Sequence, residues 1–180
     1  MANRTQVVLV DETGRSVEPS DKHAAHEAPG QLHRAFSVFL FRHDDTMLVQ
    51  QRAQSKYHFG GIWANACCSH PEPGEDLVTS AQRRVREELG IECELTEVGS
   101  FTYRAVDPVS GLVEHEFDHV LVGQTTAREL APDPDEVQDW RFVEVSSVTG
   151  AGEESGYAPW FSEALAMAVS GYEDGRLIRH

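Results

Sequence analysis

Three absences narrow the classes of protein to which this chain can belong. It has no run of about 18 apolar residues, so the sequence offers no helix that could span a membrane. Its first residues, MANRTQVVLVDETG, lack the apolar stretch of a signal peptide. Basic residues are scarce, because 15 Lys and Arg against 30 Asp and Glu give a net charge of −15. Such an acidic chain is unsuited to non-specific binding of nucleic acid or of anionic membranes, and we expect a cytoplasmic protein.

Cysteine is also scarce. The chain has three cysteines, an odd number, and two of them, Cys67 and Cys68, are neighbours. A disulfide framework is therefore excluded as the organising feature of the fold. Cys67 and Cys93 are best explained as buried apolar side chains. Cys68 is the candidate for chemistry, because a thiol close to an imidazole such as His70 can have a lowered pKa and act as a base or nucleophile.

The length of 180 residues suits one domain. We predict a single domain over residues 1–180, with a core of about 5–170 and short mobile ends. Alternation and turn signals predict strands around 7–10, 34–42, 46–52, 92–104, 112–123 and 140–145, with 34–42 and 46–52 forming a hairpin. Helical periodicity predicts helices over 75–89 and 158–172. The arrangement indicates an α+β fold, in which helices pack on a mixed or antiparallel sheet.

Residues 53–74 form a long connection between a strand and a helix, and it contains the stretch IWANACCSHPEPGE. Long connections without secondary structure are often functional in compact domains. We therefore expect this segment to contribute to a site.

A pair of carboxylates lies in the segment VEHEFDH. Side chains alternate along a strand, so Glu114 and Glu116 share one face and His115 points to the other. The plain alternative is a solvated strand face. Two carboxylates on one face repel each other, however, unless a cation lies between them or one is protonated.

Histidine is abundant, with nine residues in the chain. His26 and His33 precede the central strand, and His70 follows the two cysteines. Imidazole and carboxylate together suit Zn²⁺, Mn²⁺ or Fe²⁺ rather than Ca²⁺. The spacing alone is weak support for a metal site. Lone histidines are mostly surface residues or hydrogen-bonded core residues, and this is the interpretation for His23, His43, His58, His119 and His180.

Basic residues could form a local pocket for an anion. Arg84 and Glu88 are four residues apart on one helix face. One alternative is an exposed ion pair that contributes about 0.3–0.5 kcal/mol. The other is an acid and a base that both face a phosphate and its metal. Further cations are available for such a pocket: Lys22, Arg52 and Lys56.

The segment EPGEDLVTSAQRRVREELGI resembles a degenerate Nudix box, whose pattern is G-x5-E-x7-R-E-U-x-E-E-x-G-U with U a bulky apolar residue. Ser69 replaces the first glycine, and Arg84 replaces a glutamate that is a metal ligand in Nudix hydrolases. Three further motifs, W-x-N-x-x-C-x-H-P, Y-R-A-x-D-P and E-x-E, together with the two upstream histidines, resemble the type I isopentenyl-diphosphate isomerases. The resemblance covers roughly residues 5 to 165.

This resemblance implies a fold, an activity and a partner. The fold would be a Nudix-like mixed or antiparallel sheet sandwiched by helices. The activity would be the interconversion of isopentenyl and dimethylallyl diphosphate in isoprenoid biosynthesis, through a tertiary carbocation. The partner would be a small diphosphate, with no nucleic acid and no membrane, and the protein would be a monomer.

The resemblance also implies roles for individual residues. Glu116 with Tyr103 would deliver a proton and Cys68 would remove one, with roles exchanged in the reverse direction. A divalent cation, Mn²⁺ or Zn²⁺, would bind five ligands: His26, His33, His70, Glu114 and Glu116. Glu88 would help to bind Mg²⁺ together with the diphosphate, and Trp160 would line the hydrocarbon pocket. The positions that match diphosphate contacts are Lys22, Arg52, Lys56 and Arg84.

Two other functions stay open at this point. An ordinary Nudix pyrophosphohydrolase would need the complete acidic box, which Arg84 interrupts. A non-catalytic metal-binding module would need the ligands but neither the basic pocket nor the thiol.

Overall fold

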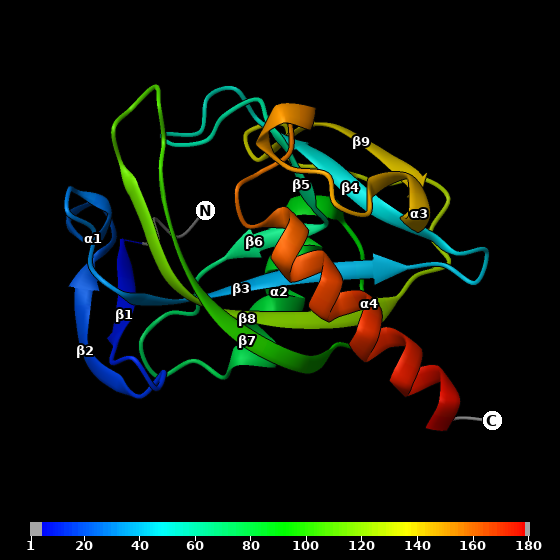
Figure 1. The fold of residues 1–180 in the computed structure, drawn as a ribbon, viewed down its shortest axis with the longest axis horizontal. Helices are drawn as coiled ribbons and strands as arrows, with labels where there is room; N and C mark the ends of the chain where they lie inside the picture. Colours follow the sequence, from blue (N-terminus) through cyan, green and yellow to red (C-terminus); the bar gives the residue numbers. More distant parts are fainter. Residues whose placement is uncertain (1–4, 179–180) are drawn as a thin grey trace.

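The computed structural model describes residues 5–178, and within this range nine strands form one mixed sheet (Figure 1). The strands are β1 Gln6–Val10, β2 Ser16–Asp21, β3 His33–Phe41, β4 Thr46–Arg52, β5 Trp63–Asn65, β6 Cys67–Ser69, β7 Thr96–Val106, β8 Val113–Gln124 and β9 Val137–Glu144. The helices are α1 Lys22–His26, α2 Leu77–Leu89, α3 Val145–Val148 and α4 Phe161–Ile178, with a 3₁₀ turn η1 at Glu153–Ser155. No helix in this range is long and apolar enough to cross a membrane.

The centre of the sheet is strand β3. It pairs in parallel with β8, from His33 opposite Glu116 to Phe41 opposite Gln124, and antiparallel with β6. Strand β8 pairs antiparallel with β7. The sheet is therefore mixed, as predicted.

The predicted hairpin of β3 and β4 forms only at its turn. Phe41 opposite Met47 is the one paired position of these strands in the described chain. Beyond it, β4 pairs with β9 and β5 instead. Strand β3 therefore pairs mainly with β6 and β8, whereas β4 pairs mainly with β5 and β9.

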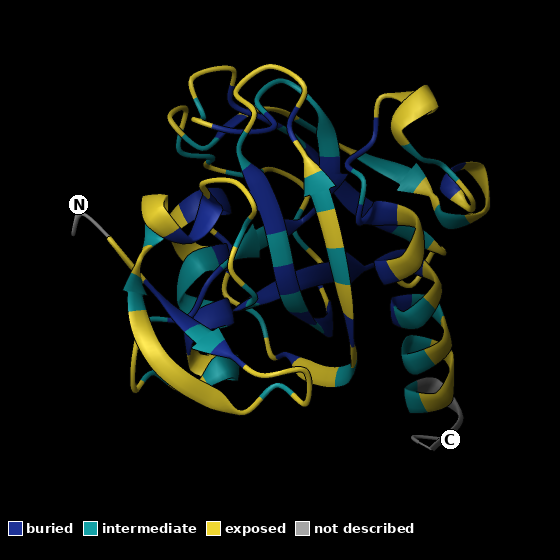
Figure 2. Ribbon diagram, turned by 60° about the vertical axis from the view of Figure 1, so that its left-hand side comes forward, coloured by how far each residue is buried: buried dark blue, intermediate teal, exposed yellow. Residues whose placement is uncertain are grey.

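Helices cover both faces of the sheet, and α4 and α2 lie on opposite sides of β3 (Figure 1). On the α4 side, Phe39, Val120 and Phe161 belong to one apolar core. On the α2 side, Val38 and Val85 belong to a second core. Alternation along β3 supplies both cores, because successive side chains point to opposite faces. Figure 2 shows the buried central strands, with much of the exposure on β2 and the outer loops.

Helix α2 begins and ends with local signals. The side chain of Asp76 accepts a hydrogen bond from the backbone N–H of Thr79 at 2.9 Å, which caps the first turn. Gly90 adopts a left-handed conformation with φ of 70°, which ends the helix as the sequence indicates. The predicted helix over 158–172 corresponds to α4, which begins later and extends further.

Short elements were not apparent in the sequence. The segment before β3 contains helix α1, which Asp21 caps by accepting from the N–H of Ala24 at 3.0 Å. The connection over 53–74 contains the three-residue strands β5 and β6. Elements this short pair through their backbone and are too brief to show a side-chain period.

Candidate active site

Strand pairing brings distant residues to one face of the sheet. Cys68 lies opposite Ser37 of β3. On the other side of β3, strand β8 presents Glu114 and Glu116 on the same face, and Tyr103 of β7 lies opposite Glu116. Cys68, Tyr103, Glu114 and Glu116 line one pocket of about 290 Å³. The pocket also contains predicted residues from other elements: Lys22, Arg52, Lys56, His70, Arg84 and Trp160.

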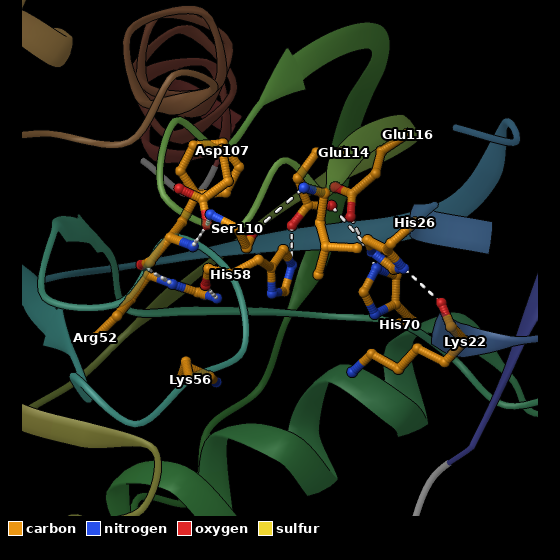
Figure 3. A network of polar contacts seen from close by, with 12 residues as sticks. Lys22, His26, Arg52, Lys56, His58, His70, Asp107, Ser110, Glu114 and Glu116 are labelled. Atoms are coloured by element: carbon orange, nitrogen blue, oxygen red, sulfur yellow. Dashed lines mark hydrogen bonds and ion pairs between the residues drawn. The ribbon is translucent and has the colours of Figure 1, made fainter. Parts of the chain in front are cut away.

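Five of the predicted metal ligands form one buried cluster. Their nearest ligand atoms all lie within 4.8 Å of one another. Figure 3 labels four of them, His26, His70, Glu114 and Glu116. His70 Nε2 is 2.8 Å from Glu116 Oε1 and 3.2 Å from His33 Nε2. His26 Nε2 is 3.3 Å from Glu114 Oε2. The structure thus brings together the whole predicted set: His26, His33, His70, Glu114 and Glu116.

Hydrogen bonds of the outer ring nitrogens prepare the histidines to bind a cation. His26 Nδ1–H donates to the carbonyl of Lys22 at 2.6 Å, and His33 Nδ1–H donates to the carbonyl of Gln31 at 2.8 Å. A carbonyl oxygen only accepts, so Nδ1 carries the proton and the Nε2 lone pair faces the cluster. Within the described chain, His26 Nε2 and Glu114 Oε2 are buried without a hydrogen-bond partner.

The pKa values of the clustered side chains also favour the binding of a cation. Burial lowers the pKa of His33 to about 4 and holds the pKa of His70 well below its ordinary value. Both imidazoles are therefore neutral, which is the form that binds metal ions. Burial and the neighbouring Glu114 raise the pKa of Glu116. A divalent cation fits a site of three neutral imidazoles and two close carboxylates.

His58 belongs to this site, although its sequence position suggested an ordinary histidine. Its side chain is 4% exposed and is in ion-pair contact with Glu114. Its ring centroid lies 5.0 Å from that of His26. The signal was its position in the 53–74 connection, but spacing gave no sign that the loop folds back onto β8.

The Y-R-A-x-D-P motif fastens that loop. Asp107, which is 4% exposed, accepts from the backbone N–H of Phe59 at 3.1 Å and from the hydroxyl of Ser110 at 2.6 Å (Figure 3). From the other side, Arg52 donates to the carbonyls of Phe59 and His58 at 2.9 and 3.2 Å. Asp107 and Arg52 thus hold the loop that carries Lys56 and His58 through the backbone of Phe59 and its neighbour.

The two adjacent cysteines face opposite sides of the sheet. Cys67 is fully buried in the core beneath α2, and burial raises its pKa. Cys68 lines the pocket, and its Sγ–H donates to Asn65 Oδ1 at 3.1 Å. The expectation of a lowered pKa is wrong for this structure, because burial outweighs the influence of Arg52 and raises the pKa of Cys68 to about 12. The thiol is therefore neutral.

Tyr103 and Trp160 complete the wall near the thiol. The hydroxyl of Tyr103 donates to Glu116 Oε2 at 2.7 Å, and burial raises the pKa of Tyr103. The Trp160 ring is 5.8 Å from the Tyr103 ring and 5.8 Å from the Arg52 guanidinium, measured to ring centroids. Its exposed fraction is 2%.

The basic side of the pocket contains both lysines of the chain, Lys22 and Lys56. Lys56 is in ion-pair contact with Glu136, and Arg84 donates to the other oxygen of the same carboxylate at 2.9 Å. Sequence reasoning missed Glu136, because its position in a loop before β9 carries no motif. Burial alone would raise the pKa of Glu136, but Lys56 and Arg84 hold it at about 2.

Glu88 lies behind Arg84, apart from the histidine cluster, and is 1% exposed. One of its oxygens accepts from Arg84 and the other from Gln50 Nε2 at 3.2 Å. The exposed fractions of the Arg84 and Glu88 side chains are 12% and 1%, so the alternative of an exposed ion pair is wrong. The six predicted metal residues therefore divide into a cluster of five and a separate Glu88.

Comparisons with known proteins agree with this geometry. Residues 31–163 match the family model described as NUDIX domain. The chain is 48% identical over 170 residues to the isopentenyl-diphosphate Delta-isomerase of Nocardia farcinica, covering 93% of this chain and 97% of the relative. It is 45% identical over 170 residues to the enzyme of the same name from Streptomyces griseus, covering 93% and 85%.

Solved structures show the fold. A protein from Deinococcus radiodurans superposes with a TM-score of 0.71 at 17% identity, covering 91% of this chain and 98% of that one. A MutT protein from Methanosarcina mazei gives 0.64 at 14% identity, covering 80% and 95%. The predicted Nudix-like α+β fold is confirmed. With its thiol, its histidine cluster and its identity to these relatives over nearly the whole length, the chain belongs to the isopentenyl-diphosphate Delta-isomerases of the Nudix superfamily.

Proposed function

We propose that this protein moves the double bond of isopentenyl diphosphate to give dimethylallyl diphosphate, by adding one proton and removing another. The observation that carries the proposal is the composition of one pocket. Cys68 lies on one wall, Glu116 with Tyr103 lies on another, and the basic residues stand along the side near α2. Proton carriers and an anion site in one cavity suit a small apolar group on a diphosphate.

The diphosphate would bind on the basic side. Arg84 offers a planar set of donors that matches phosphate oxygens, and the two lysines act as point charges. In this structure the carboxylate of Glu136 is the partner of both Lys56 and Arg84. We assign Mg²⁺ to this side with Glu88, bound together with the diphosphate. Anchoring the charged end holds a featureless hydrocarbon in position.

The reaction needs one group that carries a proton and one that does not. The terminal carbon of the alkene takes a proton, which leaves a tertiary cation, and a proton then leaves the carbon beside the one that carries the diphosphate. The neutral Cys68 thiol is the form that donates, so a turnover that starts from it needs the Glu116 carboxylate as the acceptor. The reverse reaction exchanges the two roles.

The histidine cluster would hold a second divalent cation, for which three nitrogen ligands favour Mn²⁺ or Zn²⁺ over Mg²⁺. Bound there, such a cation favours the ionised carboxylates of Glu114 and Glu116. Tyr103 orients Glu116 through its 2.7 Å hydrogen bond.

Trp160 would protect and stabilise the cationic intermediate. Its buried ring offers a π face, and a desolvated cation gains up to about 2 kcal/mol from such a contact. The ring would also help to keep water away from the cation, which water would trap as an alcohol. We further propose one domain over residues 1–180, which the continuous sheet supports, and a monomer.

The test is the product of the reaction. The protein is incubated with isopentenyl diphosphate, Mg²⁺ and Mn²⁺, and dimethylallyl diphosphate and released phosphate are both quantified. The proposal requires the isomer with the diphosphate intact. Phosphate or monophosphate release without the isomer would instead indicate a Nudix hydrolase.

A further inference from the structure

Asn65, the last residue of strand β5, is fully buried with 0% exposure. It belongs to the W-x-N-x-x-C-x-H-P motif, yet the catalytic account above leaves it without a role. Its carboxamide has two donors and an oxygen that accepts two hydrogen bonds. All four are used in this structure.

The contacts of Asn65 fix the direction of its carboxamide. Nδ2 donates to the backbone carbonyls of Val38 at 3.1 Å and Cys67 at 3.0 Å. Oδ1 accepts from Cys68 Sγ–H at 3.1 Å and from Trp160 Nε1–H at 3.2 Å. Carbonyl oxygens only accept and an indole N–H only donates, so a flipped amide would lose these pairs. The oxygen is therefore held toward the thiol and the indole.

Asn65 Oδ1 thus joins Cys68 and Trp160, which are far apart in the sequence. Cys68 has a second polar neighbour, the hydroxyl of Ser37 at 3.9 Å, but that hydroxyl donates to Asp118 at 2.7 Å. Asn65 is consequently the closer partner of the thiol. For Trp160, it accepts the hydrogen bond of the single N–H of the ring.

From this geometry we propose that Asn65 is a positioning residue for the isomerisation. Its side-chain oxygen sets the direction of the Cys68 thiol and the rotation of the Trp160 ring, so that the proton carrier and the π face approach the same carbon atoms. The inference rests on the proposed function. It differs from a purely structural role, in which Asn65 only supports the backbone at Val38 and Cys67.

Two substitutions separate the two roles. Asn65→Ala removes all four hydrogen bonds. Asn65→Asp keeps an oxygen for Cys68 and Trp160 and loses the donors to Val38 and Cys67. Thr125→Val is the control for stability, because it removes a buried hydroxyl that accepts from the N–H of Ala127 at 3.1 Å, outside the pocket.

The readout is kcat and KM for isopentenyl diphosphate per folded molecule, beside the Tm of each variant. Loss of the hydrogen bonds to Cys68 and Trp160 predicts a fall in kcat of about tenfold or more for Asn65→Ala. KM should change less than about threefold, since the basic residues are intact. Asn65→Asp should recover a clear part of kcat. Thr125→Val should lower Tm without lowering kcat.

A kcat for Asn65→Ala within about twofold of wild type would overturn the proposal, as would Asn65→Asp showing the same kcat as Asn65→Ala. If Asn65→Ala does not fold, Asn65→Asp decides alone, because the structural role predicts a kcat below about a tenth of wild type and the positioning role a higher one. Failure of the proposed function is a different result, in which the wild-type protein itself forms no dimethylallyl diphosphate.

Discussion

At the scale of single residues, strand alternation separates two neighbouring thiols into a catalytic candidate and a core residue. Cys68 lines the pocket, whereas Cys67 packs beneath α2 with 0% exposure. The assignment of Cys68 from its spacing to His70 agrees with this geometry, although its role in catalysis remains a prediction.

We therefore expect Cys68→Ala to lower kcat by about 10²–10⁴-fold, the usual contribution of a general acid or base. Cys67→Ala should keep most of the activity and lower the free energy of unfolding by about 1 kcal/mol, because it trims a small buried side chain. Isomerisation kinetics and denaturant unfolding measure the two effects. If Cys67→Ala lost activity while Cys68→Ala kept it, the roles of the two cysteines would be wrongly assigned.

Arg84 makes the second prediction at this scale. If its guanidinium binds diphosphate, Arg84→Gln removes charge-assisted hydrogen bonds that contribute about 1.5–3 kcal/mol each, and KM should rise about tenfold or more. Arg86→Gln, two residues along α2, is the matched control, since its side chain is 59% exposed and pairs only loosely with Glu92. Steady-state kinetics that show equal KM for both variants would remove Arg84 from the substrate site.

At the scale of elements, strand β8 carries its two metal ligands, Glu114 and Glu116, on one face. Between Glu114 and Glu116, His115 points away, and its Nδ1 lies 3.2 Å from the carbonyl of Gly30. Strand β8 thus carries two glutamate ligands and, between them, a histidine that is not a ligand.

Metal analysis tests this arrangement. After equilibration with Mn²⁺ or Zn²⁺, the wild-type protein should retain one ion per chain at the cluster. His33→Gln should weaken binding by more than the 10–100-fold typical of losing an outer hydrogen-bond partner of a ligand. His115→Asn should retain the ion. Equal metal content in both variants would mean that the ion binds elsewhere.

Much of this level was predictable from the sequence. The period of α2 and its end at Gly90 are local signals, and alternation placed Glu114 and Glu116 together. The cap at Asp76 was missed, because the predicted helix began at residue 75. The separation of β3 from β4 was not predictable, because it depends on which strand each one meets in three dimensions. His58 and Glu136 were missed for the same reason, since each enters the site through a loop whose path is fixed by distant contacts.

At the scale of the whole molecule, charge is distributed unequally. The chain has 30 acidic and 15 basic residues, yet its two lysines and two of its arginines gather around one pocket. Glu136 links this group, because its carboxylate joins the loop after β4 to helix α2 through Lys56 and Arg84.

The link predicts a pH dependence of stability. The folded pKa of Glu136, about 2, lies below its ordinary value of 4.5. Its ion pairs therefore stabilise the fold above about pH 4.5, and this contribution is lost as the pH falls toward about 2. Glu136→Gln should lower the free energy of unfolding at pH 7 by about 1 kcal/mol and flatten its decline in acid.

Denaturant unfolding at several pH values measures this effect. Glu92→Gln is the control, because Glu92 is 84% exposed and should leave the pH profile unchanged. A Glu136→Gln profile parallel to that of the wild type would show that the link contributes nothing to the acid dependence.

Cys68 and Glu116 are proposed to transfer protons to and from carbon in one pocket. NMR of isopentenyl diphosphate incubated with the protein, Mg²⁺ and Mn²⁺ in D₂O tests this proposal most directly. We expect deuterium in the methyl group formed from the terminal carbon, exchange at the carbon that loses a proton, and dimethylallyl diphosphate with its diphosphate intact. Substrate that keeps all its carbon-bound hydrogens, or that loses phosphate without acquiring deuterium, would contradict the proposal.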